Sequence, residues 1–180
     1  MKNKYTGVMK LSYSALCLAL ALVLPFLFTG NVPEIAKQLS PMHIPVMLCG
    51  FLCGWPYGLV VGAVAPLLRF AIFGMPVILP GGVAMAFELA VYGFICGLLY
   101  RVFPKKIPYI YVTLIISMIC GRIVWGIARF ALAGLMNSDF PMSAFIAGAV
   151  TKAIPGIILH IILIPLIVIA LKKAKLIPDE

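Results

Sequence analysis

The sequence has few charged side chains, and acidic ones are the scarcest. Only 11% of the residues are Asp, Glu, Lys or Arg, and just five are acidic. Hydrophobic residues make up 64% of the chain, which leaves too little polar surface to cover a soluble globule. The composition therefore excludes a soluble protein and predicts an all-α integral membrane protein.

Motifs for catalysis and cofactor binding are also missing. The chain has no Gly-x-x-x-x-Gly-Lys-Ser/Thr loop for ATP phosphates. The two histidines, His43 and His160, stand apart in the sequence, and neither belongs to a metal-spaced cluster or to a recognisable nucleophile arrangement. The five cysteines lie in apolar runs, where we interpret them as small buried thiols. We predict no cofactor, no metal and no catalytic residue.

Apolar stretches separated by turn residues predict a single membrane domain, residues 1–180. A spanning helix needs about 20 residues, so a chain of 180 residues has room for six helices and no separate soluble domain. The predicted helices are residues 11–28, 42–53, 58–73, 82–102, 109–135 and 142–173.

Most basic residues lie near one end of the predicted bundle, whereas the loops at the other end contain only Lys37. The nine residues at the basic end are Lys2, Lys4, Lys10, Arg101, Lys105, Lys106, Lys172, Lys173 and Lys175. The positive-inside rule predicts that both termini are cytoplasmic, in the plasma membrane. It also accounts for most of the net charge of +9 without a nucleic-acid partner.

Four basic residues remain inside the apolar stretches: Arg69, Arg122, Arg129 and Lys152. A charge in the bilayer core costs several kcal/mol, so such residues usually face a cavity, a partner or a ligand. The same stretches contain a single acid, Glu88. An interior with a net positive charge predicts a binding site for a small anion. Arg69 is the exception, because near a helix end it can extend its charge to the interface.

The spacing of these residues places them on shared helix faces. Arg122, Trp125 and Arg129 recur at i, i+3 and i+7 on the fifth predicted helix. Glu88 and Tyr92 share a face of the fourth, at a depth similar to that of the arginines. We expect Glu88 to pair with one arginine, which lowers the energetic cost of burying both charges.

The loops opposite the basic end are rich in Pro, Gly and hydrogen-bonding side chains. Residues 29–41 form a loop long enough to act as a lid over a site. His43 lies beneath this loop and is a candidate for the site wall, and Asn137 at the end of the fifth predicted helix is a candidate hydrogen-bonding residue. His160 is interpreted as a packing residue.

Two motifs link the chain to a known family. Ala15 and Ala19 form a small-residue pair four apart in the first predicted helix, and residues 40–58 run from Ser-Pro-Met-His-Ile-Pro-Val to Gly-Trp-Pro-Tyr-Gly. With the length, the six helices and the long first loop, these motifs resemble the S components of energy-coupling factor (ECF) vitamin importers over essentially the whole chain.

The resemblance implies both a partner and a role. In that family the alanine pair docks on a transmembrane T component, which sits on two ATP-binding subunits that hydrolyse ATP. The S component binds a vitamin with high affinity near the outer face, beneath its outer loops, and imports it as part of an ECF-type ABC importer. Docking is thus expected at Ala15 and Ala19.

The substrate class follows from the basic interior. A carboxylate-bearing vitamin such as pantothenate suits arginine, which can donate two parallel hydrogen bonds to a carboxylate. Its hydroxyl and amide groups would use Asn137 or Tyr92. An aromatic or nucleoside-like precursor is an alternative, because it would stack on Trp125 and the tyrosines.

Two hypotheses from other classes stay open at this point. One is a small integral membrane enzyme that uses Glu88 or His43 on a lipid-linked substrate. The other is a structural or assembly subunit whose charges only pair helices. Turnover without an ATPase partner would indicate the former, whereas tight binding of a water-soluble metabolite would exclude the latter.

Overall fold

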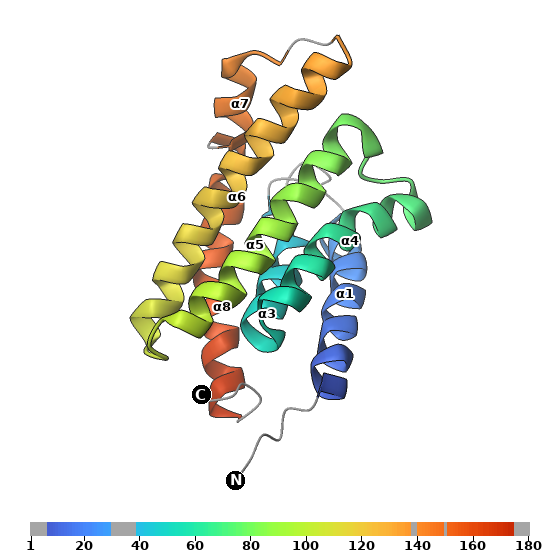
Figure 1. Cartoon of the computed structure of the whole chain (residues 1–180). Helices are drawn as coiled ribbons and strands as arrows, with labels where there is room; N and C mark the ends of the chain where they lie inside the picture. The colour runs from blue at the N-terminus through green and yellow to red at the C-terminus, as the bar shows by residue number, and fades with distance from the viewer. Residues whose placement is uncertain (1–6, 30–38, 138–139, 150, 175–180) are drawn as a thin grey trace.

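The computed structural model describes residues 7–29, 39–137, 140–149 and 151–174 (Figure 1). In chain order its elements are α1 (Gly7–Thr29), α3 (His43–Cys53), α4 (Trp55–Phe73), η1 (Ile78–Gly82), α5 (Val83–Val102), α6 (Ile107–Leu135), α7 (Met142–Ala149), η2 (Thr151–Ala153) and α8 (Ile154–Lys173). The beginning of α1 and the end of α8 lie at the same end of the bundle, whereas α7 lies at the opposite end.

Five segments in the described part of the chain are long and apolar enough to cross a membrane. They are Gly7–Leu27, Trp55–Phe73, Ile78–Val102, Ile107–Leu135 and Ile154–Lys173. The sixth apolar helix, α3, has 11 residues. At about 1.5 Å per residue it is roughly half as long as the hydrocarbon core is thick. The chain is therefore a multi-pass membrane protein with one short central helix.

Helix α3 forms the centre of the bundle. It packs against α1, α4, α5 and α8, and all of its residues except Leu52 are buried. Its sequence, HIPVMLCGFLC, has apolar residues on every side, which is typical of a helix enclosed by others. The one strongly polar residue of α3, His43, is at its first position, so the sequence delivers an imidazole into the bundle interior.

The outer helices present apolar faces to the surroundings. On α6 an exposed stripe of isoleucines recurs every four residues, at Ile115, Ile119, Ile123 and Ile127. Such an exposed stripe is typical of contact with lipid, because exposing a continuous apolar surface to water is unfavourable. The same helix turns its small and polar residues, including Ser117 and Gly121, to the inside. The face of α6 that contains Ser117 and Gly121 is therefore the one that can line a site.

Glycines let α4 and α5 approach each other closely. A Cβ atom added at Gly93 would lie 2.1 Å from the carbonyl oxygen of Gly58, and one at Gly62 would lie 2.2 Å from that of Leu89. Small residues at helix crossings allow backbone contact in membrane proteins. The contact brings Glu88 of α5, which precedes Leu89, to a fixed depth in the bundle.

The segment predicted as one helix over residues 142–173 contains α7, the 3-10 turn η2 and α8, and residue 150 between α7 and η2 lies outside the described residues. Pro155 lies in the first turn of α8, where its missing N–H is harmless. The sequence predicts a local opening at Pro155, but the break extends over η2. The other helices end within a few residues of their predicted bounds.

The predicted turn from Gly54 to Gly58 is shorter than expected. Only Gly54 lies outside the helices, with φ of 93°, a value that favours glycine. Pro56 then falls in the first turn of α4, where proline is accommodated, so the helix begins at Trp55. Most of the predicted first outer loop, residues 30–38, lies outside the described residues.

The close crossing of α4 and α5 predicts a large effect of Gly93→Val. The added side chain meets the backbone of Gly58, which cannot move aside as a flexible side chain would. We expect a loss of about 3 kcal/mol or more, at the upper end of overpacking effects, seen as a lowered thermal midpoint in detergent. Gly134→Ala is the matched control, because a Cβ there has nothing within 4 Å. An unchanged midpoint for Gly93→Val would contradict the close crossing.

Candidate functional site

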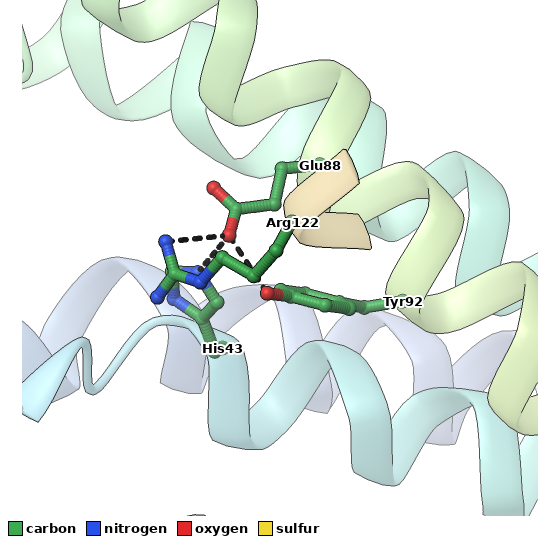
Figure 2. Close-up of polar contacts among 4 residues, drawn as sticks. All are labelled: His43, Glu88, Tyr92 and Arg122. Atoms are coloured by element: carbon green, nitrogen blue, oxygen red, sulfur yellow. Dashed lines mark hydrogen bonds and ion pairs between the residues drawn. The ribbon is translucent and has the colours of Figure 1, made fainter. Parts of the chain in front are cut away.

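The carboxylate of Glu88 lies at the centre of a buried polar cluster (Figure 2). Its side chain is 2% exposed, and its Oε1 atom lies 3.0 Å from Nη1 of Arg122. The hydroxyl of Tyr92 donates a hydrogen bond of 2.8 Å to the same oxygen. The predicted pairing of Glu88 with an arginine is thus present, and Arg122 is the partner.

Local sequence explains how α5 and α6 meet at this point. Glu88 and Tyr92 are four residues apart on α5 and share one face, as predicted. Gly121, directly before Arg122, makes room for the Tyr92 ring, because a Cβ there would lie 2.2 Å from its Cε1 atom. The ring therefore packs close to the backbone of α6, and its hydroxyl reaches the carboxylate.

Two histidines complete the cluster from helices far apart in sequence. Nε2 of His43 lies 3.6 Å from Oε1 of Glu88. The His43 ring stacks on that of His160 from α8, with centroids 5.8 Å apart and planes at 21°. Both side chains are 3% exposed. His160 was predicted to be a packing residue, but it joins the cluster through its stacking on His43.

Sequence spacing gives no signal that joins His160 to this group. It lies on α8, while its neighbours are on α3, α5 and α6. The one signal in the sequence is composition. Helix α8 has the highest mean hydropathy of the candidate spans, 2.8, and an ionisable residue is unusual in such a segment. A rare polar residue in the most apolar helix is a reason to suspect a polar interior.

Several buried polar atoms of the histidines lack a hydrogen-bond partner in the described part of the chain. They are Nδ1 and Nε2 of His43 and Nε2 of His160. Buried polar atoms in native proteins are nearly always paired, and each exception needs an explanation. The cluster can therefore offer hydrogen bonds to a small polar molecule beyond those that its own residues make.

A second group of residues lies further along α6, toward α7. The guanidinium of Arg129 stacks over the ring of Phe140, 4.8 Å from its centroid. Trp125 lies 6.1 Å from Phe140 and 6.2 Å from Phe145, between ring centroids. Phe130 also contacts both phenylalanines. We call Trp125, Phe130, Phe140 and Phe145 the aromatic cluster.

Arg129 differs from Arg122 in its surroundings. Its Nε atom is buried and has no hydrogen-bond partner among the described residues. Arg122 lies seven positions earlier, or about 10 Å along the helix, and is paired with Glu88. The stripe predicted on this helix thus contains one arginine whose charge is balanced by Glu88 and one that has no acidic partner among the described residues. Trp125 lies between them in sequence.

Two further predicted site residues, Asn137 and Arg69, do not join either group. Asn137 is exposed, just beyond the end of α6. Lys152 is in η2, and its side chain lies outside the described residues. Arg69 is 8% exposed, donates a hydrogen bond from Nη1 to the carbonyl of Leu22 on α1, and stacks on Phe26. These contacts join α4 to α1, so Arg69 has a structural partner within the bundle.

The chemistry of these groups is that of binding. Among the described residues no group of three or more His, Cys, Asp and Glu side chains is arranged to hold a metal ion. The guanidinium, imidazole and phenol groups can hold a small molecule through charge and hydrogen bonds, and the aromatic cluster can shield it from water.

The predicted docking pair lies on the outer face of α1. Ala15 and Ala19 are exposed, as are Leu16 and Leu20, whereas Cys17 on the opposite side is buried. The exposed alanines leave a shallow surface on which another helix could pack closely.

The Glu88–Arg122 pair predicts a characteristic pattern of stabilities. Arg122→Gln leaves the buried carboxylate without its ion pair, and we expect a loss of about 3 kcal/mol, as for other broken buried pairs. Glu88→Gln/Arg122→Gln removes both charges and should recover most of that loss. Unfolding in mixed micelles measures both variants. A double variant no more stable than the single one would contradict the pairing.

Comparison with known proteins gives one match. A family model described as "ECF transporter, substrate-specific component" matches residues 10–168. Searches of curated proteins and of solved structures gave no significant match. ECF S components bind small substrates and work with a T component and ATPase subunits. The match includes the Glu88 cluster (His43, Glu88, Tyr92, Arg122 and His160), Arg129 and the exposed face of α1. The chain belongs to the substrate-specific component family of ECF transporters.

Proposed function

We propose that this S component captures an anionic vitamin or vitamin precursor, with pantothenate as the leading candidate, for an ECF-type ABC importer. The observation that carries the proposal is the buried Nε of Arg129, which has no partner among the described residues. A carboxylate would supply the charge and the two acceptors that a guanidinium prefers. Membership of a family of transporter subunits speaks against the enzyme hypothesis.

The Glu88–Arg122 pair supports a division of roles in this proposal. Arg122 is neutralised by Glu88, so the anionic group of the substrate binds at Arg129, with Lys152 as a further cation. The Glu88 cluster, with Tyr92 and the His43 nitrogens that make no hydrogen bond among the described residues, then binds hydroxyl and amide groups. Asn137 lies at the rim, where it would reach the substrate only if the outer loops close over it.

The proposed orientation follows from the position of these groups. The basic ends of α1, α5 and α8 lie at the end of the bundle away from α7. We propose that this end is cytoplasmic, in a plasma membrane, and that substrate enters beside α7. The T component docks on Ala15 and Ala19, and its two ATPase subunits supply the energy for release, so the S component needs no cofactor of its own.

An aromatic or nucleoside-like precursor remains the second candidate. The aromatic cluster favours it, because Trp125 and Phe145 already stack with planes at 24° and could receive a further ring. Binding of the anionic candidate depends on the charge of Arg129, whereas binding of an aromatic candidate depends mainly on stacking.

Arg129→Ala should weaken binding of pantothenate by about ten- to a hundredfold, because a charge-assisted pair is lost. Isothermal titration of the purified S component measures the change. Lys106→Ala, an exposed basic residue at the other end of the bundle, is the matched control. Unchanged affinity in Arg129→Ala would contradict the anion site. If Trp125→Ala instead weakens binding of an aromatic ligand while Arg129→Ala does not, the second candidate is favoured.

Ala15→Trp and Ala19→Trp together should block assembly with the T component while leaving substrate binding intact. The indoles fill the shallow surface that close helix contact needs. Co-purification from membranes that contain all subunits measures assembly. Ile119→Trp, a lipid-facing position on α6, is the control. Normal assembly of the double variant would show that the alanine pair does not dock.

A further inference from the structure

A cavity of about 520 Å³ lies at the end of the bundle opposite to α7. Its walls come from the start of α1, the turn between α3 and α4, and the end of α5. None of its lining residues belongs to the Glu88 cluster or the aromatic cluster. The volume falls within the range of small-molecule binding sites, and the cavity is separate from the two groups described above.

The cavity is lined by basic residues from separate parts of the chain. Lys10 comes from α1, Arg101 from the last turn of α5, and Lys105 from the segment that follows. The described lining contains no acidic residue. Three cations that converge on one cavity produce a strong local positive potential. The chemistry therefore favours an anion with several oxygen acceptors.

One basic residue of the lining, Lys105, is held in place by contacts with its neighbours. Nζ of Lys105 donates a hydrogen bond to the carbonyl of Tyr100 and lies 4.0 Å from the centroid of the Tyr100 ring. Lys172 of α8 donates a hydrogen bond of 2.7 Å to the carbonyl of Lys105. These contacts fix the segment after α5 between two helix ends. Preorganised cations of this kind reduce the entropy that is lost when an anion binds.

The lining of the cavity also contains aromatic residues of the kinds that are common at the membrane interface. Trp55 and Tyr100 line it, and Trp55 is 37% exposed. Tryptophan and tyrosine concentrate at the membrane interface, where lipid phosphates also lie. Basic sites between helices at this level recognise anionic headgroups.

We propose that this cavity binds a phosphate group, as a phosphodiester of an anionic glycerophospholipid or as a phosphate monoester of a soluble metabolite. Lys10, Arg101 and Lys105 surround the phosphate oxygens, and Trp55 borders the attached glycerol. The site is separate from the substrate site and does not depend on which vitamin is bound.

The test uses the full-length protein in nanodiscs that contain equal amounts of phosphatidylglycerol and phosphatidylcholine. Native mass spectrometry counts the lipids that remain bound after the protein is released from the nanodisc. We expect wild type to retain phosphatidylglycerol, and Lys10→Gln/Arg101→Gln to retain at least tenfold less, because two charge-assisted contacts are lost. Lys106→Gln/Lys173→Gln, with the same change of charge outside the cavity lining, should behave as wild type. Lys10→Arg/Arg101→Lys should also retain the lipid.

A second arm distinguishes the source of the phosphate. Glycerol 3-phosphate is titrated into wild type and Lys10→Gln/Arg101→Gln in nanodiscs of phosphatidylcholine alone. Saturable binding that the double variant loses would assign the site to a soluble monoester. If wild type and the double variant behave alike with both probes, the proposal is wrong. It is also wrong if the double variant keeps its phosphatidylglycerol but fails to assemble with the T component, because the cavity is then a protein contact.

Discussion

The buried carboxylate of Glu88 is the interaction on which the polar interior depends. Its partners come from α3, α5 and α6, so one acid relates three helices to one another. In a low-dielectric interior such contacts are strong when they are satisfied and destabilising when they are broken. Helix α3 is too short to be positioned by its own span across the bilayer. Its depth is set by its neighbours and by the contact between His43 and the Glu88 cluster.

This arrangement divides the interior into two levels. Near Glu88 the positive charge of Arg122 is balanced, and polar groups dominate. Toward α7, Arg129 lies among aromatic rings and has no acidic partner among the described residues. A ligand that spans both levels would place its anionic group on one side and its hydroxyl or amide groups on the other. Such a difference along the site gives a preferred direction of binding as well as affinity.

Much of the fold could be predicted from the sequence, because hydrophobic stretches in membrane proteins have few possible structures. The helix bounds and the pairing of Glu88 follow from hydropathy and helical spacing. The choice of Arg122 over Arg129 does not, because the two lie on the same face and only the crossing of α5 and α6 brings one within reach. His160 was missed for a similar reason, since its contact with His43 is set by packing between α3 and α8. The break before α8 was underestimated, because Pro155 marks where a helix begins but not how far the preceding turn unwinds.

The alanines on the outer face of α1 have a consequence for the free and assembled states of the protein. If the T component docks on this face, as proposed, the same surface contacts lipid tails in the free protein and another helix in the assembly. A long side chain would lose rotamer freedom each time it passed from fluid lipid to a packed interface. Alanine has none to lose, so exchange between the two environments involves little change in side-chain entropy. The small residues of α1 thus suit reversible association, in which neither state is strongly favoured by the side chains at the contact.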